Sequence, residues 1–134
     1  MFAKLFAVLL VASSVLAAPV AEVEQLEKRK THNGQATYFS VGLGACGWNN
    51  VDSDYIVAVN SAQYGLNGYG GNCGQKVVIT NTDNGKSITA QVADECPTCS
   101  WGSLDLSPSA FGALTDNNFD LGVFPISWHY KKRN

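Results

Sequence analysis

Short apolar runs, each bounded by glycine, asparagine or serine, recur along the sequence from residue 34 onward. Several are rich in β-branched and aromatic residues, whose side chains favour the pleated, half-buried surface of a strand. The strands predicted on this basis are Gly34–Phe39, Lys76–Asn81, Lys86–Ala93 and Gly122–Tyr130. A further run, Tyr55–Val59, is compatible with a strand or a bent half-turn. Because Pro125 has no N–H to donate to a ladder, we expect it at a sheet edge or a bulge.

Turn and cap signals separate these runs. Asn84-Gly85 lies between two predicted strands and predicts a type I′ hairpin turn, which needs positive φ at both central residues. Ser107 before Pro108 predicts the start of a helix that runs to about Leu114. Five or six short strands with one or two short helices predict a mainly β fold, a small barrel rather than a helical bundle.

Two glycine-rich segments, Ser40–Asn50 and Gln63–Gly74, predict open loops, because glycine permits positive φ and close backbone approach. Tyr64 and Tyr69 are expected to be exposed in the second loop. Neither segment ends in the Gly-Lys-Ser/Thr of a phosphate-binding loop.

The first 29 residues differ in composition from the rest of the chain. Residues 1–17 combine an early Lys4, an apolar stretch and a small-residue Val15-Leu16-Ala17 ending, which together predict a signal peptide. Residues 18–29 are acidic and end in Lys28-Arg29, which predicts a pro-segment cut after the dibasic pair or, alternatively, a solvated linker helix. We therefore expect a secreted, extracellular protein whose single domain occupies residues 30–134.

The charge balance excludes some partners. The chain carries a net charge of −2, and residues 1–29 contain as many acidic as basic residues. Neither a nucleic-acid footprint nor a polybasic membrane patch is visible, so we expect no nucleic-acid partner and no membrane association after signal removal. The basic tail Lys131-Lys132-Arg133 is expected to be solvated.

Four cysteines follow the predicted leader: Cys46, Cys73, Cys96 and Cys99. Secretion favours disulfides, for which three pairings are possible. The competing interpretation is a zinc site with His129 as an additional ligand, but one C-x-x-C alone is a weak metal signal. We expect no metal and no cofactor.

Two carboxylates flank the cysteine-bearing segment between the last strands. Asp94 closes an apolar run, and Asp105 lies between Leu104 and Leu106 just before the predicted helix. Carboxylates at such places often accept backbone N–H bonds, so spacing alone favours a structural role. The alternative is a polar site on an apolar scaffold.

The ordered motifs of the chain resemble fungal expansin-like proteins, which belong with the rare-lipoprotein-A-like double-psi β-barrels. The resemblance spans Gly34 to Tyr130 and is most like the single-domain, loosenin-like members. It rests on GQATYF, GACGW, NCGQKVVITN, VADECPTC, GSLDLSPSAF and PISWHY. It implies a six-stranded double-psi β-barrel with an open groove, and a monomer that binds cell-wall polysaccharide of the cellulose or chitin type and loosens it without hydrolysis.

The resemblance also assigns residues to the groove. Asp105 falls on the key aspartate and Asp94 on the second groove aspartate, which by family position orients Asp105 or the sugar. Thr37 and Tyr38 fall on groove-lining positions.

The family pattern further implies a Cys46–Cys73 disulfide, which leaves Cys96–Cys99 as the second pair. The loop tryptophans Trp48 and Trp101 are expected either to stack on sugar rings or to cover the barrel core. Trp128, in the last predicted strand, is expected in the core.

Two departures from the family limit the chemistry. Related endoglucanases carry a catalytic base directly after the aromatic pair of the first strand, where this chain has Ser40, and a hydroxyl cannot activate water as a carboxylate can. The C-terminal carbohydrate-binding domain of plant expansins has no counterpart in the sequence, so the expected affinity is weak.

Two alternatives belong to other functional classes. A lytic transglycosylase needs only one acid, which Asp105 would supply. A protease-inhibitor or defence protein on the same barrel would present Gln63–Asn72 as its inhibitory edge.

Overall fold

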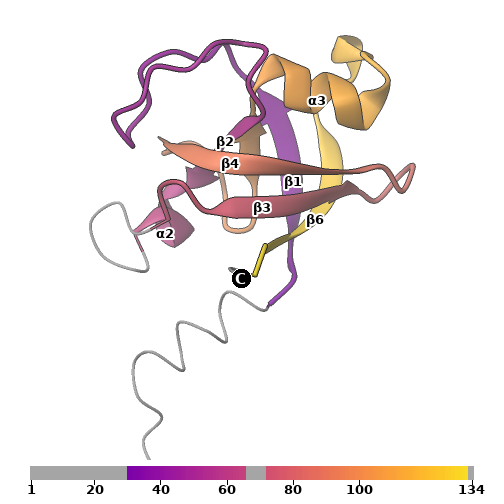
Figure 1. The fold of residues 1–134 in the computed structure, drawn as a ribbon. Coiled ribbons are helices and arrows are strands. Elements are labelled where there is room, and N and C mark those ends of the chain that lie inside the picture. Colours follow the sequence, from indigo (N-terminus) through magenta and orange to yellow (C-terminus); the bar gives the residue numbers. More distant parts are fainter. Residues whose placement is uncertain (1–29, 66–71, 133–134) are drawn as a thin grey trace, which may run out of the picture.

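The computed structural model describes residues 30–65 and 72–132, so the predicted signal peptide and pro-segment lie outside the described residues. Six strands form a closed barrel in the order β1-β5-β2-β4-β3-β6 (Figure 1). The mainly β barrel predicted from the sequence is therefore confirmed. The strands are β1 His32–Tyr38, β2 Ile56–Asn60, β3 Lys76–Asn81, β4 Ser87–Cys96, β5 Leu104–Leu106 and β6 Phe124–Tyr130.

Strand pairing is mixed. The β1–β5 and β2–β4 pairs are parallel and the other four pairs are antiparallel. β2 therefore lies between β4 and β5, the two strands that carry the candidate carboxylates. Closure gives each of the six strands a neighbour on both sides, so Pro125 does not lie on a sheet edge. It pairs with Gln35, one residue beyond the last β3–β6 pair at Ile126, where its missing N–H costs no ladder bond.

The core fills the barrel interior. Alternate residues of neighbouring strands, among them Ala36, Val59 and Leu104, are completely buried because successive strand side chains point to opposite faces. Trp128 is also completely buried, as predicted, and its Nε1 donates to the Gly102 carbonyl at 2.8 Å. The helix α3 Pro108–Thr115 lies over one end of the barrel (Figure 1) and adds buried apolar side chains to the core.

Local contacts correct two predicted details. Ser107 precedes α3 as expected, but it makes no side-chain cap; its hydroxyl instead accepts the backbone N–H of Ile56 at 3.3 Å. The turn at Asn84-Gly85 is not type I′, because only Gly85 has positive φ. The Gly85 N–H donates to the Asn81 carbonyl at 2.8 Å, and Asn84 uses its side chain to bond Lys86 N and the Leu114 carbonyl.

The second predicted loop is partly helical. α2 Ser61–Tyr64 follows β2 directly, because the Asn60 side chain accepts the Gln63 backbone N–H at 3.1 Å and caps it. Tyr64 is half-buried against the core rather than exposed, and Tyr69 lies outside the described residues. The 3-10 helix η1 Phe119–Leu121 occupies the turn before β6. Within the described part of the chain, no helix is long and apolar enough to span a membrane.

Both predicted disulfides form. Cys46 joins Cys73 across 27 residues, and Cys96 joins Cys99 across three. All four cysteines are therefore paired, which rules out the competing zinc site built on their thiolates.

Candidate functional site

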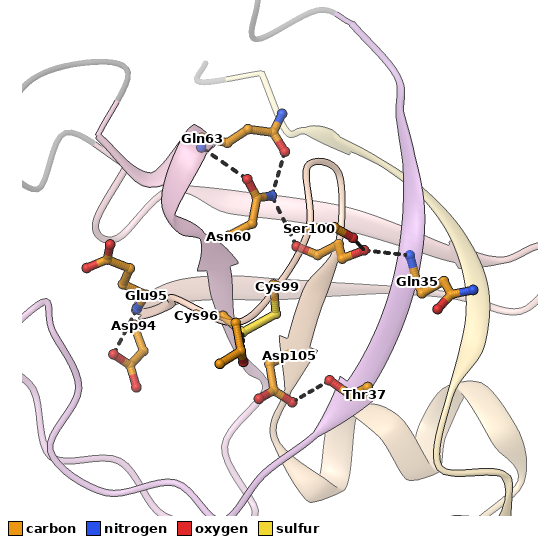
Figure 2. The surroundings of a disulfide bond; sticks show 12 residues. Gln35, Thr37, Asn60, Gln63, Asp94, Glu95, Cys96, Cys99, Ser100 and Asp105 are labelled. Carbon is orange, nitrogen blue, oxygen red and sulfur yellow. Dashed lines mark hydrogen bonds between the residues drawn. A yellow bond between two sulfur atoms is a disulfide. The ribbon is translucent and has the colours of Figure 1, made fainter.

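The two candidate carboxylates lie on either side of one central strand. Ala58 in β2 pairs with Asp105 of β5 on one side and with Asp94 of β4 on the other. Asp105 in turn pairs with Thr37 of β1. Residues directly opposite one another on paired strands share a face of the sheet. These four side chains therefore form one row across four strands, named here the carboxylate row, which Figure 2 shows in the order Asp94, Asp105, Thr37.

The carboxylate row lies on the outside of the barrel. Leu104 and Leu106 flank Asp105 along β5, and both are completely buried in the interior core. Alternation along the strand then directs Asp105 to the outer face, where it is half-buried. The small side chain of Ala58 leaves room between the two acids.

Asp105 is held by its neighbours on the barrel wall. The Thr37 hydroxyl donates to Asp105 Oδ1 at 2.9 Å (Figure 2). Partial burial, with a smaller contribution from the Asp94 charge, raises the pKa of the Asp105 carboxyl above its ordinary value. The bonds from the Thr37 hydroxyl and the Leu106 backbone act in the opposite direction but do not cancel the effect of burial. Asp105 can therefore accept a hydrogen bond from a ligand when it is ionised and donate one when it is protonated.

Asp94 is bound to the backbone instead. Its Oδ1 accepts the N–H groups of Ala45 and Glu95, each at 2.8 Å. The Ala45 bond attaches the glycine-rich loop to β4, and the Cys46 N–H donates to the Ala93 carbonyl beside it. The approach is so close that a Cβ on Gly44 would lie 2.4 Å from the Ala93 oxygen. Asp94 thus positions the loop that borders the carboxylate row.

The two acids are not direct neighbours on the barrel wall. Neighbouring strands lie about 4.8 Å apart, so the Cα atoms of Asp94 and Asp105 are separated by roughly 10 Å across β2. Thr37, and not Asp94, makes the contact that orients Asp105.

The aromatic candidates lie in different places. Trp48 is 43 % exposed and Trp101 is 57 % exposed, so both present ring surface to solvent. Tyr38 points to the opposite face of β1 from Thr37, and its ring packs 4.6 Å from that of Phe111, under α3. Tyr38 therefore lies at the end of the barrel and not in the carboxylate row, and it is 40 % exposed there.

Sequence reasoning missed two residues that shape this site. Ala58 belongs to an apolar strand and gives no sign of its position between two acids until the strand order is known. Gly44 is one of many glycines, and only its approach to Ala93 distinguishes it. Within residues 30–65 and 72–132, no group of three or more metal-ligating side chains is assembled.

Sequence comparison finds two relatives of this chain. The chain is 33% identical over 101 residues to the papain inhibitor of Streptomyces mobaraensis, which covers 72% of this chain and 69% of that protein. It is 27% identical over 111 residues to an Asp f 7 allergen homologue of Arthroderma benhamiae, but spans only 38% of its length. No model of a known protein family matches the chain.

Solved structures show the same barrel. The Streptomyces papain inhibitor aligns with a TM-score of 0.67 at 31% identity, over 78% of this chain and 96% of that one. A Clavibacter michiganensis expansin mutant, solved in complex with cellohexaose, aligns with a TM-score of 0.66 at 33% identity. The alignment covers 78% of this chain but only about half, 52%, of the expansin. Cerato-platanin 3 from M. perniciosa, at 17% identity and a TM-score of 0.58, shares the fold. The chain therefore belongs to the expansin-like, rare-lipoprotein-A-like family of double-psi β-barrels.

Proposed function

We propose that this protein is a secreted, non-hydrolytic expansin-like module that binds and loosens cell-wall polysaccharide of the cellulose or chitin type. The observation that carries the proposal is the carboxylate row, which places Asp105 and Asp94 on the outer barrel wall. The likeness to an expansin solved with cellohexaose supports it.

The row offers sugar hydroxyls two kinds of partner. Asp105 accepts a hydrogen bond when ionised and donates one when protonated, and Thr37 fixes its orientation. Asp94 commits Oδ1 to two backbone N–H groups, so Oδ2 is the oxygen with which it would meet a sugar. The exposed tryptophans Trp48 and Trp101 supply surfaces on which pyranose rings stack.

The carboxylate row offers one acid, Asp105, but not the pair of carboxylates that hydrolysis needs. Hydrolysis needs a second carboxylate that acts as base or nucleophile across the sugar ring. Ser40 occupies the family position of that base, and it lies exposed just beyond β1. A transglycosylase reaction needs only the acid, so product analysis must separate it from pure binding.

The test compares Asp105→Asn with the wild-type protein on cellulose, chitin and peptidoglycan. We expect binding to weaken about tenfold or more, since a hydrogen bond to a charged group contributes about 1.5–3 kcal/mol, with no soluble sugar released by either protein. Asp120→Asn, which removes an exposed charge from η1, is the matched control and should bind as wild type does. Reducing ends or anhydro-sugar products that Asp105→Asn abolishes would make the protein an enzyme and overturn the proposal.

A second candidate function is inhibition of a papain-like protease, favoured by the relative that matches at 33% identity. The predicted inhibitory edge Gln63–Asn72 includes residues 66–71, which lie outside the described residues. Stoichiometric inhibition of papain that survives Asp105→Asn, combined with no polysaccharide binding, would favour this function.

Secretion with removal of residues 1–29 remains part of the proposal. N-terminal sequencing of the secreted protein should read from Lys30. A first residue of Ala18 or Pro19 would contradict a pro-segment.

A further inference from the structure

A hollow of about 280 Å³ lies on the barrel wall, and three lysines line it. Its lining residues are Gly74, Gln75, Lys76, Lys131 and Lys132. The chain directly after β6 brings these lysines together, because the Lys131 N–H donates to the Lys76 carbonyl at 2.8 Å. Lys131 and Lys132 are exposed, as expected from the sequence, and the backbone bond of Lys131 holds the start of this tail beside β3.

The lysine hollow is adjacent to the carboxylate row. Lys76 pairs with Gln91 of β4, and Gln91 pairs with Ile56, two residues before Ala58 on β2. Two residues of a strand span about 7 Å, so the hollow begins roughly one row of side chains away from Asp94.

Trp48 connects the two places. A Cβ on Gly74, in the wall of the hollow, would lie 3.2 Å from Trp48 Cη2, so the indole ring lies directly against that wall. The loop that carries Trp48 is attached to Asp94 through the Ala45 N–H. A chain of sugars that leaves the carboxylate row over Trp48 would reach the lysines next.

The lysines of the hollow carry charges that no carboxylate of the described residues neutralises. Among the described residues, no ion pair joins Lys76, Lys131 or Lys132 to a carboxylate; Lys86 and Asp116 pair instead, at the β3–β4 turn. Like charges around one hollow repel one another, and an anion placed among them relieves that repulsion.

We propose that the lysine hollow binds the carboxylate of an acidic, uronate-bearing polysaccharide whose neighbouring sugars occupy the carboxylate row. This inference rests on the proposed polysaccharide-binding function and specifies its ligand class. The hollow is slightly smaller than the roughly 300–1,000 Å³ of a drug-sized pocket, which suits a single charged sugar unit.

The test uses two forms of one probe: an oligomer of α-1,4-linked galacturonate, and the same oligomer with its carboxylates methyl-esterified. Titration calorimetry at low salt should show the wild-type protein binding the charged form about tenfold more tightly, since three partly exposed charge contacts each contribute modestly. The preference should decrease as salt is added, because exposed charges are screened.

Substitutions locate the effect. Lys76→Gln, Lys131→Gln and Lys132→Gln should each weaken binding of the charged form about two- to fivefold, and the triple variant should bind both forms equally. Lys86→Gln removes the same charge elsewhere on β3–β4 and should leave the preference unchanged.

Each outcome decides the inference separately from the proposed function. Equal binding of both forms by the wild-type protein, or a preference that the triple variant keeps, overturns the proposed role of the lysine hollow. The proposed function is still supported in that case if Asp105→Asn loses binding to cellulose or chitin. Competition by a single-stranded oligonucleotide as strong as that of the charged oligomer overturns the assignment to uronates. If the wild-type protein binds neither oligomer and binds neither cellulose nor chitin, both proposals are overturned.

Discussion

Asp94 and Asp105 flank the same alanine on the same face of the barrel, yet the protein holds them by different means. Asp94 accepts two backbone N–H groups and attaches a loop whose Cys46 is also joined to Cys73, 27 residues away. Asp105 accepts one side-chain hydroxyl from a strand that pairs with its own.

The difference shows what each acid does for the fold. Removing Asp94 would release loop structure, whereas removing Asp105 would disturb little besides a partly buried charge. We therefore expect changes on the Asp94 side to appear as lost stability, and changes at Asp105 to appear as lost binding.

The largest expected effect concerns the two disulfides. Replacing Cys46 and Cys73 by alanine should lower the free energy of unfolding by about 3–4 kcal/mol in the loop-entropy account. The same replacement of Cys96 and Cys99, which lie three residues apart, should cost about 1–2 kcal/mol. Urea denaturation of the two double variants measures both values. Equal losses of unfolding free energy would show that tying down the glycine-rich loop through Cys46–Cys73 stabilises the fold no more than the short Cys96–Cys99 bridge does.

A smaller effect is expected from filling the close approach of the glycine-rich loop. Gly44→Ala places a methyl group 2.4 Å from the Ala93 oxygen, so the loop must shift, at a cost of about 1–3 kcal/mol. Gly42→Ala is the matched control, because its added Cβ meets nothing within 4 Å. Thermal unfolding should show a decrease for the first variant only. A Gly44→Ala protein as stable as Gly42→Ala would mean that the loop is not tightly seated on β4.

Replacement of the two acids tests the comparison directly. Asp94→Ala removes the acceptor of two backbone N–H groups and should cost about 1–2 kcal/mol, a value reduced by its partial exposure. Asp94→Asn keeps an acceptor oxygen and should recover most of that loss. Asp105→Asn should leave stability near that of wild type at neutral pH. Equilibrium denaturation of the three variants checks this order, and a larger loss for Asp105→Asn would reverse the assigned roles.

The sequence predicted the barrel and both disulfides. Strand-forming runs and cysteines can be recognised locally, and the family resemblance supplied their arrangement in the fold. The predicted turn type at Asn84-Gly85 was wrong. The Asn84 side chain bonds the Lys86 N–H and a carbonyl of α3, and local sequence propensity does not predict the second, long-range bond. The two candidate aspartates were likewise visible, but not their difference. That difference depends on strand order, which places β2 between them, and on a loop that reaches Asp94 from 49 residues away.

The smallest effect concerns the pH dependence of stability at Asp105. Burial raises the pKa of this carboxyl in the folded protein above its value in the unfolded chain. Between those two values the folded state binds more protons, so the contribution of Asp105 is fully present below the unfolded pKa and is lost as pH rises through the folded pKa. Asp105→Asn removes that loss. The variant should therefore gain slightly in melting temperature relative to wild type at pH 7, and show no gain at pH 3.

Thr37 makes the same effect adjustable. Its hydroxyl favours the ionised form of Asp105, so Thr37→Val should raise the pKa of Asp105 further and shift the loss of stability to higher pH. Thr37→Ser keeps the donor and should behave as wild type. The carboxyl carbon resonance of Asp105, followed by NMR across the titration, measures the pKa in each protein. An unchanged pKa in Thr37→Val would mean that the 2.9 Å contact does not stabilise the charge, and that burial, the Asp94 charge and the Leu106 backbone set the pKa of Asp105.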